Sequence, residues 1–286
     1  RLSPEGHERL DDSETFTKRV GGAELNVATG VAMLGLRTGI ISKLPSNPLG
    51  TFAKNRIRFS GVSDDYLVYD DSKEARLGLY YYEIGRYPRK PSVVYDRANT
   101  SFSHSNISDY PESMYASTKL FHVSGVTLAL CEETRNTAIE MIHKFKEAGA
   151  LISFDVNFRG NLWTGDEARE CIEKFLPYVD IFFCSEDTAR LTFGKTGTAE
   201  EIMKSFTEEY PISIVASTQR IVHSPKHHTF GSVIYSRKTD TFYKEDPYVR
   251  IQVVDRIGSG DAYCSGVLYA LLSEPDNFQR AVEFGN

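Results

Sequence analysis

The most informative segment of this chain is Asp255-Arg-Ile-Gly-Ser-Gly-Asp-Ala-Tyr263, which places two glycines and a carboxylate between a β-like run, Ile251 to Val254, and an apolar run, Ala262 to Leu272. This order predicts a strand, a tight turn and the start of a helix. A glycine-rich turn at a helix N-terminus aims several backbone N–H groups at one point, where the helix dipole also favours an anion. The turn is therefore a candidate phosphate site.

Asp261 lies within one helical turn of these amides. A carboxylate there is placed to accept the proton of a hydroxyl that attacks a bound phosphoryl group, as in a phosphotransferase. Aspartate is also a common helix-capping residue, and glycines are common in strand-to-helix turns. From the residues alone, a capping role and a catalytic role for Asp261 stay open.

The motif D-x-x-G-S-G-D-A over residues 255–262 resembles the D-x-x-G-x-G-D signature of the ribokinase-like (PfkB) sugar kinases. In that family the second aspartate is the catalytic base and the glycine turn forms the anion hole. The resemblance implies that Asp261 is the base and that Gly258, Ser259 and Gly260 form the hole, with both glycines also touching the nucleotide. It further implies a three-layer α/β/α core with a mainly parallel sheet and a small β-sheet lid.

The organisation of the chain agrees with an α/β fold. From about Ala23, helix-like and strand-like segments alternate, which predicts a mainly parallel sheet covered by helices on both sides. The glycine turn is then expected at the carboxyl end of a strand, where such sheets bind ligands. One domain over residues 1–286 is expected, without repeats or linkers. The predicted strands are Thr38 to Ser42, Leu120 to Ser124, Leu151 to Val156, Asp180 to Cys184 and Ile212 to Ala216.

Three β-like segments interrupt this alternation: Thr15 to Val20, Ala75 to Ile84 and Ser92 to Arg97. A hairpin inserted into an α/β domain is either a lid or an edge extension without a role, and the pattern alone does not choose. Ribokinase-like enzymes carry a lid here that covers the sugar and often pairs with a second subunit. The resemblance thus implies lid strands from about 12–20 and 75–98 and a homodimer or a higher multiple.

The segment Gly21-Gly-Ala-Glu-Leu-Asn26 opens a second predicted helix with bare backbone amides. Such a terminus can hold hydroxyls or a carboxylate. From the residues alone, a simple turn with an exposed Asn26 is the favoured interpretation. The G-G-x-x-x-N pattern resembles the sugar-contacting motif of ribokinase-like kinases, which implies that Gly22 and Asn26 bind substrate.

Two further segments point to the substrate. Strand alternation predicts that Asp155, Asn157 and Arg159 share one side at a strand end, where unpaired charges are too costly to bury. Together with Leu162-Trp163, this D-x-N-x-R pattern resembles the 2-keto-3-deoxygluconate kinases of the family, which implies that Arg159 binds substrate and Asn157 the nucleotide.

The lid segments carry tyrosines, which in a half-buried sheet usually serve packing. They also resemble the lid of sugar-acid kinases, which implies that Tyr80, Tyr95 and Arg97 contact substrate. A guanidinium matches a carboxylate and has no comparable use for a neutral sugar. Arg97 and Arg159 together favour an acidic sugar.

On the nucleotide side, Ser185 and Thr188 stand where the family usually has N-x-x-E, a motif linked to magnesium and phosphate. This departure puts direct metal ligation in doubt and leaves Glu186 or Asp187 to act through water. Ser217 and Gln219 follow a strand where the family's nucleotide loop lies. The cofactors implied by the resemblance are ATP and Mg²⁺.

Composition excludes other classes of protein. The chain has 33 basic and 39 acidic residues, a net charge of −6, which offers nothing to attract nucleic acid. No apolar run is long enough for a membrane span. The four cysteines are scattered singly, as in a reducing compartment, so a cytoplasmic enzyme is expected. The first residue is Arg1 and the last segment stops within a predicted helix, so both ends are expected to be incomplete.

The sequence thus predicts an ATP-dependent sugar-acid kinase that converts 2-keto-3-deoxygluconate to 2-keto-3-deoxy-6-phosphogluconate. The same chemistry on fructose, ribose or 5-dehydro-2-deoxygluconate stays open, because one fold hosts many substrates. A catalytically weak, sugar-sensing relative is the alternative of a different class.

Overall fold

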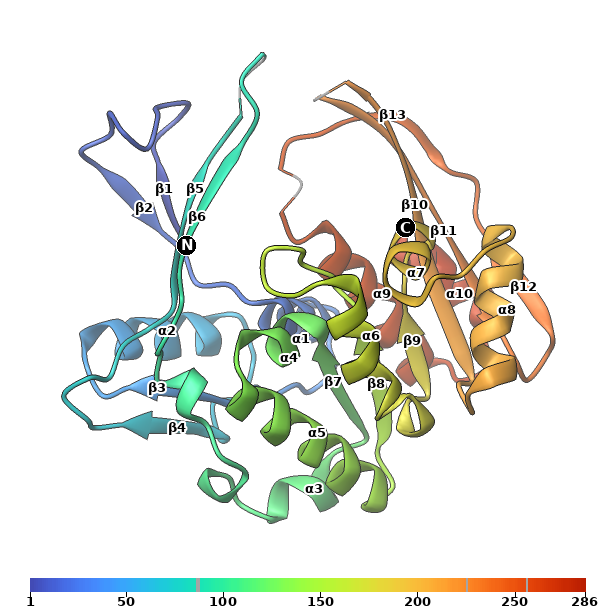
Figure 1. The fold of residues 1–286 in the computed structure, drawn as a ribbon, viewed down its shortest axis with the longest axis horizontal. Helices are drawn as coiled ribbons and strands as arrows, with labels where there is room; N and C mark the ends of the chain where they lie inside the picture. Colours follow the sequence, from blue (N-terminus) through green and yellow to red (C-terminus); the bar gives the residue numbers. More distant parts are fainter. Residues whose placement is uncertain (86–87, 225, 256) are drawn as a thin grey trace.

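A seven-stranded sheet forms the middle of the molecule, and helices cover both of its faces (Figure 1). The structure is a computed structural model that describes residues 1–85, 88–224, 226–255 and 257–286. The strand order is β12-β11-β10-β9-β8-β7, and β13 pairs with β11. Strands β7 to β10 are parallel, whereas β11, β12 and β13 pair in antiparallel fashion. The strands are β7 (Leu120–Ser124), β8 (Leu151–Asp155), β9 (Ile181–Phe183), β10 (Ile214–Ser224), β11 (His227–Ser236), β12 (Thr241–Lys244) and β13 (Tyr248–Gln252).

Each face of this sheet buries its own hydrophobic core. The larger core packs the sheet against α3 to α8, and the smaller one packs it against α1, α9 and α10. This arrangement confirms the predicted three-layer α/β fold with a mainly parallel sheet. The helices are α1 (Ala23–Met33), α2 (Pro48–Phe59), α3 (Ser113–Ser117), α4 (Gly125–Leu130), α5 (Glu132–Glu147), α6 (Gly165–Glu173), α7 (Glu186–Phe193), α8 (Ala199–Glu209), α9 (Ser259–Ser273) and α10 (Phe278–Gly285).

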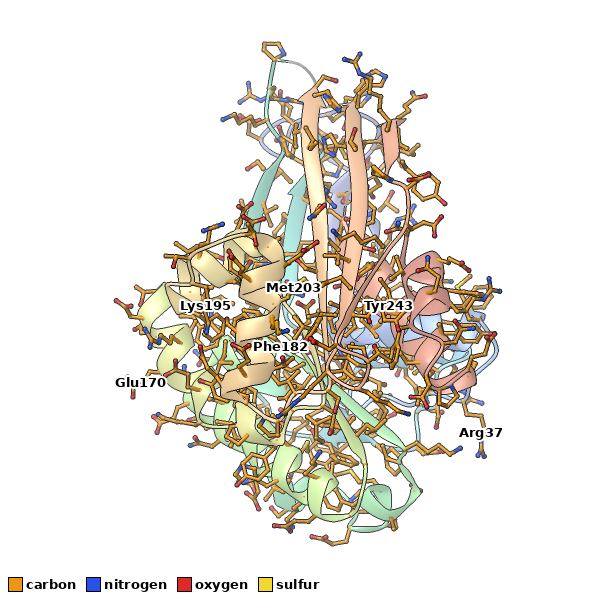
Figure 2. All side chains as sticks on the ribbon, turned by 90° about the vertical axis from the view of Figure 1, so that its right-hand side faces the viewer. Arg37, Glu170, Phe182, Lys195, Met203 and Tyr243 are labelled. Atoms are coloured by element: carbon orange, nitrogen blue, oxygen red, sulfur yellow. The ribbon has the colours of Figure 1, made fainter. Side chains whose placement is uncertain are left out.

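Local sequence explains where several helices begin. Thr164 and Thr198 each form a capping box. The threonine hydroxyl accepts a hydrogen bond from the backbone N–H of a glutamate three residues later, and the glutamate carboxylate accepts one from the threonine backbone N–H. The buried side of α8 then meets β9 through Phe206, whose ring lies 4.9 Å from that of Phe182. Figure 2 shows Phe182 inside the molecule and Glu170 at its periphery. Among the described residues, no helix has the length and apolar character needed to cross a bilayer.

Most of the predicted strands are confirmed within one or two residues, but two predictions are wrong. Thr38 to Ser42 was expected to be a strand, whereas β3 begins only at Ser42 and pairs with β4 (Leu67–Asp70) in a separate two-stranded sheet. Residues 216–220 were expected to end a strand, whereas β10 continues to Ser224 and forms a long hairpin with β11. The continuous ladder with β11 satisfies the backbone groups that a loop would leave open.

The strand before the glycine turn also differs from expectation. It was expected to present the turn at the carboxyl end of a parallel strand. Instead, β13 ends at Gln252 and pairs antiparallel with the first residues of β11, on the flank of the sheet. The turn therefore reaches the parallel strands through the start of α9 rather than through its own strand.

A second, four-stranded sheet stands apart from the main body (Figure 1). Its order is β2-β1-β5-β6, and the two segments predicted to form a hairpin, β5 and β6, pair antiparallel as expected. The sequence did not predict β1, a three-residue strand that joins β2 to β5. The strands are β1 (Leu2–Pro4), β2 (Phe16–Lys18), β5 (Leu79–Glu83) and β6 (Ser92–Asp96).

Candidate active site

Asp261 and the glycine turn lie at the N-terminus of α9, as the sequence predicts. Gly258 caps the helix with φ of 79°, in the left-handed region that favours glycine. The Asp261 carboxylate accepts a hydrogen bond from the Asn26 side-chain amide, with 2.7 Å between Nδ2 and Oδ2. Burial raises the pKa of Asp261, and the bond from Asn26 partly offsets this rise. The structure thus brings together the two predicted helix N-termini.

The close approach of α1 and α9 explains this contact. A Cβ atom added to Gly30 would lie 2.3 Å from the Ser265 hydroxyl oxygen, so only glycine fits between the two helices at this level. Gly30 lies one turn after Asn26 and Ser265 one turn after Asp261. The glycine therefore sets the spacing at which the amide and the carboxylate meet.

Tyr80 of the small sheet faces the same space. A cavity of about 360 Å³ is lined by Asn26, Tyr80 and Gly258, among others. A Cβ atom added to Gly21 would lie 3.8 Å from both the Tyr80 hydroxyl and the Asn26 side-chain oxygen, so these groups crowd around one point. The rings of Tyr80 and Tyr95 are 6.0 Å apart across β5 and β6. Gly22 caps α1 directly beside this cluster.

Arg97 continues this surface at the base of the small sheet. Its guanidinium carbon lies 3.9 Å from the centre of the Tyr95 ring. One of its terminal nitrogens is buried and has no hydrogen-bond partner among the described residues. Burial lowers the pKa of Arg97, and the positive charge of Arg159 lowers it further. Two guanidinium groups thus lie within electrostatic reach of each other, and one carries a buried, unused donor, which suits an anionic ligand.

Asp155 is a site residue to which the sequence analysis gave no role. Its carboxylate accepts a hydrogen bond from the Asn157 backbone N–H at 3.0 Å, and its second oxygen lies 3.8 Å from the Cys264 sulfur. Burial and the negative charge of Asp261 raise the pKa of Asp155 to about 7. The signal available in the sequence was a carboxylate at the end of an apolar strand beside an arginine.

Asn157 and Arg159 do not follow the predicted strand alternation. Strand β8 ends at Asp155, and Asn157 adopts a left-handed φ of 37°. The chain therefore turns out of the sheet before it reaches Arg159. Arg159 is exposed, yet its charge stabilises the ionised forms of both Asp155 and Asp261.

Glu24 is a residue of this region that was not predicted from the sequence. One of its carboxylate oxygens accepts three hydrogen bonds, from the Ser124 N–H at 3.0 Å, the Ser124 hydroxyl at 2.8 Å and the Thr127 hydroxyl at 2.7 Å. It joins the first turn of α1 to the start of α4. Its negative charge also contributes to the raised pKa values of Asp155 and Asp261.

The residues proposed to act on magnesium through water, Glu186 and Asp187, do not come together as direct metal ligands. The Ser185 hydroxyl caps α7 by accepting from the Thr188 N–H, and Glu186 is paired with Arg190. Asp187 is exposed on the same helix. Over the described parts of the chain, no three His, Cys, Asp or Glu side chains gather around one point. These residues therefore do not fit a directly ligated Mg²⁺.

The nucleotide candidates of β10 lie on a strand rather than in a loop. Ser217 is 2% exposed, whereas Gln219 is exposed. The next residue, Arg220, donates a hydrogen bond to the Ser259 hydroxyl at 2.8 Å, which ties β10 to the glycine turn. This link was not predicted, because the sequence cannot show that β10 continues past the parallel part of the sheet.

Comparison with known proteins identifies the family that this chain resembles. Residues 3–286 match the model of the pfkB family carbohydrate kinases. The chain is 32% identical over 286 residues to a 2-dehydro-3-deoxygalactonokinase of Haloferax volcanii, covering 100% of this chain and 85% of the relative. It is 26% identical to a 5-dehydro-2-deoxygluconokinase of Bacillus subtilis, covering 97% and 81%. The crystal structure of a 2-dehydro-3-deoxygluconokinase of Thermotoga maritima superposes with a TM-score of 0.92 at 30% identity, covering 99% and 88%.

The raised pKa of Asp155 predicts how stability changes with pH. The folded carboxyl titrates near 7 and the unfolded one near 3.8, so the folded state binds the additional proton between these values. The contribution of Asp155 to the free energy of unfolding therefore falls as pH rises through this window. Asp155→Asn removes the effect. Urea unfolding should show the variant gaining about 1–3 kcal/mol on the wild type between about pH 5 and about pH 8. An equal change in both proteins would contradict the prediction.

Proposed function

Because this chain belongs to the pfkB family of carbohydrate kinases, whose members carry out ATP-dependent phosphorylation of a carbohydrate, we propose that its substrate is 2-keto-3-deoxygluconate and its product the 6-phosphate. The observation that carries the chemistry is the contact between Asn26 and Asp261 beside the turn formed by Gly258, Ser259 and Gly260. That contact fixes one carboxylate at the end of a helix that favours anions.

In the proposed reaction, Asp261 accepts the proton of the terminal hydroxyl as that oxygen attacks the γ-phosphorus of ATP. The second carboxylate oxygen is left for the substrate, because Asn26 holds the first. The backbone amides of the turn stabilise the charge that develops on the transferred group. Arg220, which is bonded to Ser259, steadies the turn from the side of β10.

The acidic substrate class rests on Arg97 and Arg159. A buried guanidinium nitrogen without an acceptor is unfavourable, because it has lost its hydrogen bonds to water. A sugar carboxylate would supply the acceptor that this nitrogen of Arg97 lacks. The Haloferax volcanii and Thermotoga maritima relatives are named for two sugar acids that differ in configuration, and the Bacillus subtilis relative for a third, 5-dehydro-2-deoxygluconate. The galactonate epimer is therefore the first alternative, and 5-dehydro-2-deoxygluconate, fructose and ribose complete a test panel.

We propose one domain over residues 1–286, with the four-stranded sheet as its lid. Its inner face carries Tyr80, which lines the cavity, and Tyr95, which is paired with Tyr80 across β5 and β6. Closure over the sugar would exclude water from the transferred phosphoryl group. The nucleotide assignments of Asn157, Ser185, Ser217 and Gln219 remain part of this proposal.

Asp261→Asn tests the base. The substitution keeps the shape and removes the proton acceptor, so kcat should fall by at least about 100-fold with little change in substrate KM. The measurement is coupled ADP release across the sugar panel. Asp246→Asn, at an exposed aspartate away from the site, is the matched control and should keep wild-type turnover. Near-normal turnover of Asp261→Asn would show that the residue only caps α9, and a wild type inactive on the whole panel would refute the kinase assignment.

Arg97→Ala tests the substrate class. Loss of the guanidinium should weaken acidic-sugar binding by about 2 kcal/mol or more, because the sugar carboxylate loses its charged partner. The control is Arg76→Ala, which removes an ion pair with Asp96 from the same sheet. Calorimetric titration with acidic and neutral sugars compares the two variants. Equal losses for both sugar types would assign Arg97 to the fold rather than to recognition.

The outer face of the lid predicts self-association. Phe16, Tyr81 and Val94 lie on the side opposite Tyr80, and Phe16 and Val94 are 38% and 53% exposed. The simplest way to bury this apolar surface is to pack it against the same face of a second copy of the chain. Sedimentation at micromolar concentration should show a homodimer or a multiple of it, and Val94→Asp should shift it toward monomer. A fully active wild-type monomer would rule this out.

A further inference from the structure

Arg220 extends from the main sheet to the glycine turn. Strand β10 pairs with β9 over residues 214–216 and then continues with β11 as its partner to Ser224. This hairpin extends past the helices on the side of the molecule where the four-stranded sheet stands (Figure 1). Arg220 lies on the extension, and its Nη2 donates a hydrogen bond to the Ser259 hydroxyl at 2.8 Å. A cationic side chain of β10 therefore reaches the first residue of α9.

Two aromatic rings support the arginine in this position. Phe230 of β11 is its partner across the hairpin, and the guanidinium carbon lies 5.8 Å from the centre of that ring. The Phe230 ring in turn meets the Tyr263 ring of α9 edge to face, with 6.4 Å between the ring centres. Directly opposite residues of an antiparallel pair share one face of the sheet, so Arg220 and Phe230 both face α9. These contacts hold the guanidinium at the end of the helix.

The turn that Arg220 reaches is suited to an anion. The first N–H groups of a helix have no acceptor within the helix, and Gly258 has no side chain to supply one at α9. The carboxylate of Asp261 is bonded to Asn26 instead. A phosphoryl group at the turn would carry more negative charge than neutral amides can offset. A guanidinium offers both the charge and planar donors that match phosphoryl oxygens.

We propose that Arg220 is a phosphate-binding residue, whose guanidinium, held by the Ser259 hydroxyl and the Phe230 ring, contacts the phosphoryl group that is transferred. This inference rests on the proposed function, since it requires a phosphoryl group at residues 258–260. A guanidinium has five N–H donors in one plane, so it can bridge a serine oxygen and a phosphoryl oxygen at the same time. Arg220 thus acts on the reacting group itself and does more than steady the turn.

The proposed charge acts on a balanced transfer. The sugar hydroxyl oxygen forms a bond to the γ-phosphorus while its proton passes to Asp261. The bond from the γ-phosphorus to the bridging oxygen breaks, and its electron pair stays on ADP. Arg220 gains and loses no proton, because a guanidinium stays charged far above neutral pH. Its charge stabilises the oxygens of the transferred group in the transition state, as arginines do in other phosphoryl transfers.

Arg220→Ala tests the charge. The kcat measured by coupled ADP release should fall by at least about 100-fold, because the transition state loses a fixed cation. Guanidine hydrochloride at millimolar concentration should raise the kcat of this variant about tenfold, since a free guanidinium can enter the space beside Ser259. The same concentration of sodium chloride should not. A free cation could not restore a lost tether between β10 and α9, so rescue separates the charge from a structural role.

Calorimetric titration without sugar gives a readout that does not depend on turnover. With Mg²⁺ present, Arg220→Ala should bind a non-hydrolysable β,γ-imido analogue of ATP about tenfold more weakly than the wild type. Its affinity for ADP should change by less than about twofold, because ADP has no γ-phosphoryl group to place at the turn. Ser259→Ala removes the hydroxyl and keeps the backbone amide, so it should lower kcat by a smaller factor, about three- to tenfold.

Arg237→Ala is the matched control. Arg237 follows the far end of β11, and its side chain donates to the Tyr210 carbonyl at 3.4 Å. This variant should keep wild-type turnover and show no response to guanidine. Urea unfolding checks that Arg220→Ala is folded. Arg220→Lys, which keeps the charge without the planar fork, should retain part of the kcat that Arg220→Ala loses.

Several outcomes would overturn this inference. One is near-normal kcat in Arg220→Ala. Another is an equal loss of affinity for ADP and for the ATP analogue, which would place Arg220 away from the transferred group. A loss of kcat that neither guanidine nor Arg220→Lys restores would assign the residue to the fold. A wild type that is inactive on the whole sugar panel would instead overturn the proposed function, whatever the Arg220 variants show.

Discussion

The active site depends on the close packing of α1 against α9. These helices are far apart in the sequence, and their N-termini meet because Gly30 leaves room for Ser265 one turn further along. The contact of Asn26 with Asp261 follows from that spacing. A wider separation would break the hydrogen bond and would also pull the glycine turn away from the cavity beside Tyr80. One steric constraint therefore fixes the positions of the proposed base, the proposed anion hole and the proposed sugar side of the site together.

The charges of the site are arranged against one another. Three carboxyl groups, Glu24, Asp155 and Asp261, are gathered near the ends of the parallel strands, and each is held differently: by three hydroxyl and amide donors, by a thiol and a backbone N–H, and by a side-chain amide. The charge of Arg159 acts on Arg97 as well as on Asp155 and Asp261. Like charges this close to one another repel, and burying them costs free energy unless an oppositely charged ligand binds or a proton neutralises one of them. An anionic substrate would reduce the repulsion between the two guanidinium groups, and protonation would reduce the repulsion among the carboxyl groups.

The sequence predicted those features that local chemistry determines. Glycine, the following aspartate and the apolar run specify the turn and the start of α9, and periodicity located β7, β8 and β9. It could not give the direction of β13, because a short apolar strand looks the same beside a parallel or an antiparallel neighbour. It missed β1, which is three residues long and exists only through pairing with distant strands. Glu24 was missed, and Asp155 was placed at the strand end without a role, for a related reason, since burial of a carboxylate is a property of the tertiary fold.

The place of Arg97 has a mechanical consequence. The arginine follows β6 directly, and a Cβ atom added to Gly78 would lie 3.4 Å from the Cβ of Arg97 and from the Thr100 side chain, so the segment that enters β5 and the segment that leaves β6 lie in contact here. If the four-stranded sheet closes as proposed, this contact is the place about which it would rotate. Tyr80 and Tyr95, further along the strands, would then move more than the Arg97 guanidinium. The carboxylate end of the sugar could stay bound to Arg97 while the phosphorylated end is released.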